Sequence, residues 1–131
     1  MQTKSLPKVI ATSVIRSVSH GESHGGVYIV DLASRKIDQV VDWNTTAINW
    51  EGRGLDRGLR GIAFYQESTY IAASDEIFVF DKSFNIVKSF RNPYLRHCHE
   101  ISIAGTNLYI TSTGFDSVLV FDLTQERFIH G

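Results

Sequence analysis

The sequence predicts an all-β fold made of one four-strand unit that is repeated along the chain. A short apolar run that ends in aspartate occurs at residues 77–81 and returns at residues 118–122, with a weaker copy at residues 27–31. Asp81 and Asp122 are 41 residues apart, and a period of about 40 residues is typical of an array of one supersecondary unit. No segment shows the apolar period of a helix.

The elements follow in the same order in each unit, as short β-runs separated by turn residues. The first unit has runs at residues 9–13, 27–31 and 36–43. The second has runs at residues 60–64, 70–74, 77–81 and 85–90. The third has runs at residues 99–103, 109–113, 118–122 and 126–130. Residues 9–13 match residues 70–74, so the first unit lacks its innermost strand and the sequence predicts eleven strands.

Four short strands in a unit of this length indicate the blades of a β-propeller. The runs Leu-Tyr-Ile-Thr-Ser and Val-Leu-Val-Phe-Asp of the third unit resemble propeller repeats of the NHL or YVTN type, and the Trp-Asp signature of another propeller class is absent. The resemblance covers residues 8–130. It implies one propeller domain over residues 1–131, with blades at about 8–43, 58–91 and 97–130. A β-sandwich of repeated hairpins is the alternative, but a sandwich needs no fixed period.

Three blades do not close a ring. Each blade buries its faces against its neighbours, so an open array of three exposes two apolar faces. The chain is expected either to pair with a second copy in a six-bladed ring or to be part of a longer propeller. For the isolated chain the sequence predicts a homodimer.

The composition narrows the range of partners. The net charge is −1 and 43% of the residues are hydrophobic, so no basic excess points to nucleic acid. The apolar runs are too short to span a bilayer, and the first residues lack the apolar core of a signal peptide. A single cysteine, Cys98, excludes an intramolecular disulfide. A cytoplasmic protein that binds neither nucleic acid nor membrane is expected.

The long connections all fall at one end of the predicted blades. They are residues 19–26, 44–58 and 92–96, whereas the turns at the opposite end have about three residues each. Binding residues concentrate on loops that a rigid scaffold holds. The loop end is therefore the predicted site.

Cationic side chains recur where each complete blade begins. Arg57 aligns with Arg96, and Arg60 aligns with His99. Guanidinium groups suit a carboxylate or phosphate ligand, so the favoured function is a module that binds an anionic small molecule or peptide. The predicted ligand-binding residues are Trp50, Glu51, Arg57, Arg60, Arg96, His97 and His99. In the alternative interpretation, the arginines pair with nearby carboxylates and only hold the loop in place.

A metal-assisted hydrolase or lyase is the second hypothesis, and whether the chain is an enzyme stays open. Strand alternation would place His97 and His99 on one side, with Cys98 and Glu100 on the other. Imidazole and carboxylate are common ligands of divalent metals, so His97, His99 and Glu100 form a possible metal site that His20 or His24 would complete. Cys98 is expected to be a buried apolar residue.

Three repeated aspartates have a structural explanation. Asp31, Asp81 and Asp122 each end the third strand of a unit, immediately before a tight turn. Aspartate at this position caps the backbone of a turn. Their presence in every copy predicts a scaffold role and not a catalytic one.

Overall fold

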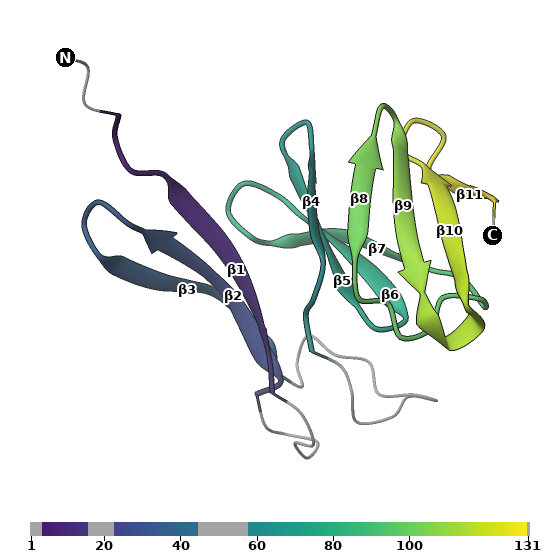
Figure 1. The fold of residues 1–131 in the computed structure, drawn as a ribbon, viewed down its shortest axis with the longest axis horizontal. Helices are drawn as coiled ribbons and strands as arrows, with labels where there is room; N and C mark the ends of the chain where they lie inside the picture. The colour runs from purple at the N-terminus through teal and green to yellow at the C-terminus, as the bar shows by residue number, and fades with distance from the viewer. Residues whose placement is uncertain (1–3, 16–22, 45–57, 131) are drawn as a thin grey trace. The chain divides into compact units, whose positions relative to one another are not determined.

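A computed structural model describes residues 4–15, 23–44 and 58–130, and within them it confirms an all-β fold of eleven strands (Figure 1). Blade 1 contains β1 (Lys8–Val14), β2 (Gly25–Asp31) and β3 (Lys36–Asp42). Blade 2 contains β4 (Ile62–Tyr65), β5 (Ser68–Ala73), β6 (Glu76–Phe80) and β7 (Ile86–Arg91). Blade 3 contains β8 (Ile101–Ala104), β9 (Asn107–Ser112), β10 (Ser117–Asp122) and β11 (Arg127–His130). Each blade is an antiparallel meander.

The chain divides into two compact units, residues 1–58 with blade 1 and residues 59–131 with blades 2 and 3.

A single turn of 3₁₀ helix, η1 (Thr113–Phe115), is the only helix among the described residues. No helix in that part of the chain is long and apolar enough to cross a membrane.

Blades 2 and 3 share one hydrophobic core, because alternate residues of each strand point to the same face of a sheet. Blade 2 contributes Ala63, Tyr70, Ala72, Ile77 and Val79. Blade 3 contributes Ile101, Leu108, Ile110, Leu119 and Phe121. At the outer edge Phe121 stacks on Phe90, with ring centroids 3.9 Å apart, and meets Phe128 edge-on at 5.1 Å. These aromatic contacts fix the two blades face to face.

The strand register confirms the predicted repeat in blades 2 and 3. Tyr70 lies opposite Val79, and Tyr109 lies opposite Val120 in the same way. In blade 1 the predicted match is wrong by one residue, because the partner of Ile29 is Ile10 and not Val9. Residues 10–14, and not 9–13, therefore correspond to residues 70–74. A slip of one residue exchanges the two faces of a strand, so Val9 shares a face with Val30.

The innermost strands of blades 2 and 3 approach closely just before they begin. The Gly61 N–H donates a hydrogen bond of 2.9 Å to the carbonyl oxygen of His99. A Cβ atom at position 61 would lie 2.8 Å from the backbone nitrogen of Ile101 and 2.9 Å from the Cα of Glu100. Only glycine allows this approach of the two backbones.

The repeated aspartates cap the turns between the third and fourth strands, as predicted. In each blade one carboxylate oxygen accepts hydrogen bonds from two backbone N–H groups of the turn. The donors are Ala33 and Ser34 for Asp31, Ser83 and Asn85 for Asp81, and Thr124 and Gln125 for Asp122, at 2.8 to 3.1 Å. The scaffold role of these residues is confirmed.

The turn hydrogen bonds make stability depend on pH. The Asn85 N–H is the main cause of the lowered pKa of Asp81, and the Thr124 hydroxyl is the main cause of the lowered pKa of Asp122. Because both pKa values lie below the ordinary 3.8, the carboxylates stabilise the fold above about pH 4, and this stabilisation is lost as the pH falls through the folded-state pKa.

We therefore expect the urea midpoint of the wild-type chain to fall more steeply between about pH 5 and pH 2 than that of the Asp81→Asn/Asp122→Asn variant. Asparagine keeps the acceptor oxygen but does not titrate there. If the urea midpoints of the two proteins changed equally with pH, the Asp81 and Asp122 carboxylates would not be the source of the pH dependence.

Candidate functional site

The long connection that the structure describes is the link between blades 2 and 3, residues 92–100. It lies at the same end of the blades as η1, whereas the turns at 66–67, 105–106 and 123–126 lie at the opposite end (Figure 1). The link carries Arg96, His97, His99 and Glu100, all of which are exposed. We call it the 92–100 link.

Two predicted ligand-binding residues meet at the end of the 92–100 link. Arg60 Nη1 lies 3.3 Å from His99 Nδ1. A guanidinium only donates, so Nδ1 accepts and the Nε2 of His99 carries the proton. Arg60 and His99 occupy equivalent positions in the repeat, and the structure places their side chains together.

Thr111 on β9 holds this end of the link, a role that the sequence did not indicate. Its Oγ1 accepts the N–H groups of His99 and Glu100 at 3.2 and 3.0 Å and donates to the Glu100 carbonyl at 3.1 Å. One hydroxyl therefore fixes the backbone from which His99 and Glu100 project.

The strand geometry that the sequence assigned to His97 and His99 is wrong. His97 has a left-handed backbone with φ of 54°, and β8 begins only at Ile101. Strand alternation therefore does not apply to residues 97–100. The Thr113 hydroxyl donates to the His97 carbonyl oxygen at 2.8 Å, which fastens this turn to η1.

Cys98 is fully buried, as predicted. Its N–H donates to the Ser74 carbonyl oxygen at 2.8 Å, so the residue also joins blade 2 to the link. Burial raises the pKa of the thiol to about 11, and a thiol of this kind is not a nucleophile near neutral pH.

The metal hypothesis gains no support from the described residues, among which no group of three or more histidines, cysteines and carboxylates could hold an ion. His24 lies immediately before β2 in the unit of blade 1 and is fully buried. Its backbone N–H donates to the carbonyl oxygen of Trp43 at 2.6 Å. His20, Trp50, Glu51 and Arg57 lie outside the described residues.

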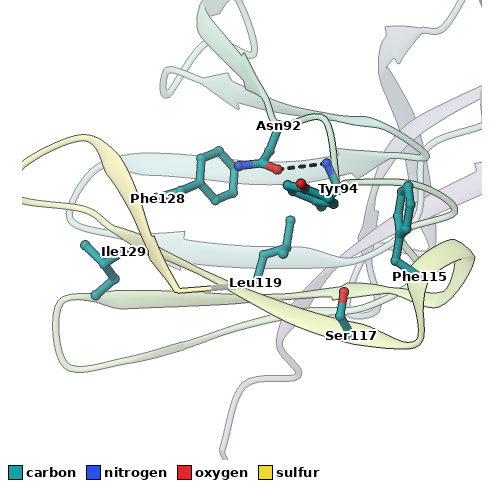
Figure 2. Close-up of a pocket in the computed structure, with 7 residues that line it drawn as sticks. All are labelled: Asn92, Tyr94, Phe115, Ser117, Leu119, Phe128 and Ile129. Atoms are coloured by element: carbon teal, nitrogen blue, oxygen red, sulfur yellow. Dashed lines mark hydrogen bonds between the residues drawn. The ribbon is translucent and has the colours of Figure 1, made fainter.

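An apolar hollow of about 440 Å³ opens beside the other end of the 92–100 link (Figure 2). It is lined by Asn92, Tyr94, Phe115, Ser117, Leu119, Phe128 and Ile129. The rings of Tyr94 and Phe115 form its mouth; they meet edge-on at 5.7 Å and are 62% and 46% exposed. Asn92 Oδ1 accepts the Tyr94 N–H at 2.9 Å. The buried hydroxyl of Ser117 has no hydrogen-bond partner within the described residues.

Arg96 lies between Tyr94 and His99 on the 92–100 link and packs against η1. Its side chain crosses Gly114, where a Cβ atom would lie 2.9 Å from Arg96 Cβ and Cγ. The Gly114 N–H donates to the Arg96 carbonyl oxygen at 3.0 Å. The 92–100 link therefore carries Tyr94, which lines the hollow, together with the basic residues Arg96 and His99.

Similarity to known proteins is confined to structure. No protein-family model matches the sequence, and no curated protein matches it. The chain superposes on a propeller chain in the crystal structure of a nidogen/laminin complex with a TM-score of 0.62 at 13% identity. The fold is that of a β-propeller. The match covers 93% of this chain and 41% of the other, so this chain spans less than half of the solved propeller chain. The narrower resemblance to NHL or YVTN repeats stays a prediction.

Proposed function

We propose that the chain is a binding module that holds an acidic peptide at the loop end of blades 2 and 3. The observation that carries the proposal is the 92–100 link, on which Tyr94 borders an open apolar hollow and Arg96 and His99 supply basic groups. A propeller within a solved protein complex supports binding of a protein partner.

The basic groups suit carboxylates of a peptide. Arg60 and Arg96 are permanently charged and offer several donors each. His99 directs its Nδ1 toward Arg60, so its Nε2–H is the donor available to a ligand. Glu100 is the opposing charge on the same link, and it weakens the attraction for an anion.

The hollow suits one apolar side chain of the same peptide. Its volume of about 440 Å³ falls in the range of small-ligand pockets. Leu119 and Phe128 provide apolar walls, and the two exposed rings at the mouth would be partly covered by an aromatic or aliphatic side chain. Aromatic residues are the usual anchors of protein interfaces.

Removing the two arginines is expected to weaken peptide binding by at least about tenfold, since each charge-assisted hydrogen bond contributes about 1.5–3 kcal/mol. The measurement is fluorescence anisotropy with a labelled peptide in which aspartates flank a phenylalanine, for the wild type and for Arg60→Ala/Arg96→Ala. Glu100→Gln should strengthen binding. Lys82→Ala is the matched control, because Lys82 pairs with Glu67 at 2.7 Å at the opposite end of blade 2. Equal affinity of the wild type and the double variant would refute the proposal.

Removing the aromatic mouth is expected to weaken binding of the same peptide by about tenfold, through the lost apolar contact. The variant is Tyr94→Ala/Phe115→Ala, and the peptide with alanine in place of phenylalanine should bind the wild type as weakly. Phe64→Ala is the control, because Phe64 is 60% exposed on β4 and does not line the hollow. Unchanged affinity of the variant would exclude the hollow as the anchor site.

Self-association is the second part of the proposed function. A propeller blade packs between two others, and three blades leave two outer faces. We therefore propose that the isolated chain forms a dimer, which light scattering at micromolar concentration would detect.

A further inference from the structure

We propose that the outer face of blade 3, which carries Tyr109, Thr111, Val118 and Val120, binds blade 1 of a second copy of the chain. The proposal rests on the self-association proposed above and names the two surfaces that make the contact. It follows from the strand register of the three blades.

The outer face of blade 3 corresponds, in the repeat, to the face that blade 2 packs against blade 3. Tyr109 pairs with Val120 as Tyr70 pairs with Val79. In blade 2 this face packs on blade 3, and Tyr70 is 5% exposed. In blade 3 the same face is open, since Tyr109 is 39% and Val118 is 52% exposed.

The correspondence between blades 2 and 3 indicates which kind of surface covers the outer face of blade 3. Blade 2 presents Tyr70, Ala72, Ile77 and Val79 to a neighbouring blade and not to solvent. Blade 3 repeats the pattern with Tyr109, Thr111, Val118 and Val120. The occupant is therefore a β-sheet face of the kind that blade 3 itself turns toward blade 2, with Leu108, Leu119 and Phe121 at its centre.

Blade 1 carries a face of that kind. Val30 precedes Asp31 as Phe121 precedes Asp122, and its partner Val9 is equivalent to Leu108, the partner of Phe121. Ile37 lies opposite Val30 and extends the face onto β3.

Tyr28 and its partner Ala11 complete the blade 1 face, as the equivalents of Leu119 and Ile110. Val9 and Ile37 are 43% and 66% exposed, so this apolar face is also open.

Both halves of the contact are therefore present in one chain. Blade 3 of one copy binds blade 1 of the second, and blade 3 of the second binds blade 1 of the first. The two contacts are identical, so a pair of chains satisfies every such face and the assembly is closed. Apolar burial of this kind is the main source of free energy in stable homodimers.

The test is sedimentation velocity of four purified proteins. Wild type is expected to be a dimer. Val118→Glu and Val9→Glu, one on each face, are expected to raise the dimer dissociation constant by at least about 100-fold, because each places a charge in an apolar contact. Val87→Glu is the control, because Val87 is 56% exposed on β7 and belongs to neither face; it should remain a dimer.

Mixing the Val118→Glu and Val9→Glu variants distinguishes the loss of a contact from a failure to fold. The Val118→Glu chain keeps an intact blade 1 face, and the Val9→Glu chain keeps an intact blade 3 face, so an equimolar mixture should form a heterodimer through one contact. Heterodimer formation supports the proposal. Variants that remain dimeric, or a mixture that stays monomeric, would overturn these surfaces while leaving self-association intact. A monomeric wild type would overturn both.

Discussion

Replacing Phe121 with alanine is expected to lower the free energy of unfolding by about 3–5 kcal/mol. Phe121 is 5% exposed, stacks on Phe90 and meets Phe128 edge-on, so it joins β10 both to blade 2 and to its own outer strand. Truncation removes the apolar burial, both ring contacts and the filling of the core, and these losses add.

Urea denaturation of the whole chain, followed by circular dichroism, measures the effect. Phe121→Leu keeps most of the apolar volume and should cost less than half as much. Phe115→Ala is the matched control, because this ring is 46% exposed and lies outside the core; it should change the free energy by less than about 1 kcal/mol. A loss of similar size in both alanine variants would show that Phe121 does not hold the blades together.

Replacing Gly61 with alanine is expected to cost about 2–4 kcal/mol, at the upper end of the range for overpacked sites. The added methyl would lie 2.8 to 2.9 Å from three backbone atoms, of His99, Glu100 and Ile101. Backbone atoms cannot rotate away as a side chain can, so the innermost strands of the two blades would have to separate. The hydrogen bond from Gly61 to His99 would weaken with them.

The same denaturation experiment measures this variant. Gly105→Asn is the control, because a Cβ atom added at Gly105 would meet no atom within 4 Å beyond its chain neighbours, and the φ of 62° suits asparagine. The control should remain within about 0.5 kcal/mol of wild type. If Gly61→Ala were equally mild, the close approach of the strands would not be a requirement of the fold.

The repeat made most of the fold predictable. Apolar residues alternate along each strand, and Asp81 and Asp122 mark the same point of each copy, so the strands of blades 2 and 3 were placed within about two residues. The register of β1 was not predictable, because Val9, Ile10 and Ala11 are all apolar and either alignment places apolar residues on both faces. Only pairing with β2 decides between the two.

The site was predictable only where it follows the repeat. Alignment gave Arg60 and His99 equivalent positions at the start of blades 2 and 3, and the structure shows that their side chains lie together. The hollow combines residues from the link, η1, β10 and β11, and no local pattern joins such distant positions. Two sequence signals were present: the long connection at residues 92–96, which carries Asn92 and Tyr94, and the turn at residues 114–117, which is two residues longer than its copy in blade 2.

Thr111 belongs to two surfaces at once. Its hydroxyl holds the backbone of His99 and Glu100, and its place opposite Val118 puts it on the outer face of blade 3. In the proposed dimer, a second copy that packs on Val118 therefore also contacts the residue that holds the backbone of His99. We therefore expect the two proposed events to be thermodynamically coupled: the factor by which dimer formation changes peptide affinity equals the factor by which the peptide changes the strength of the dimer.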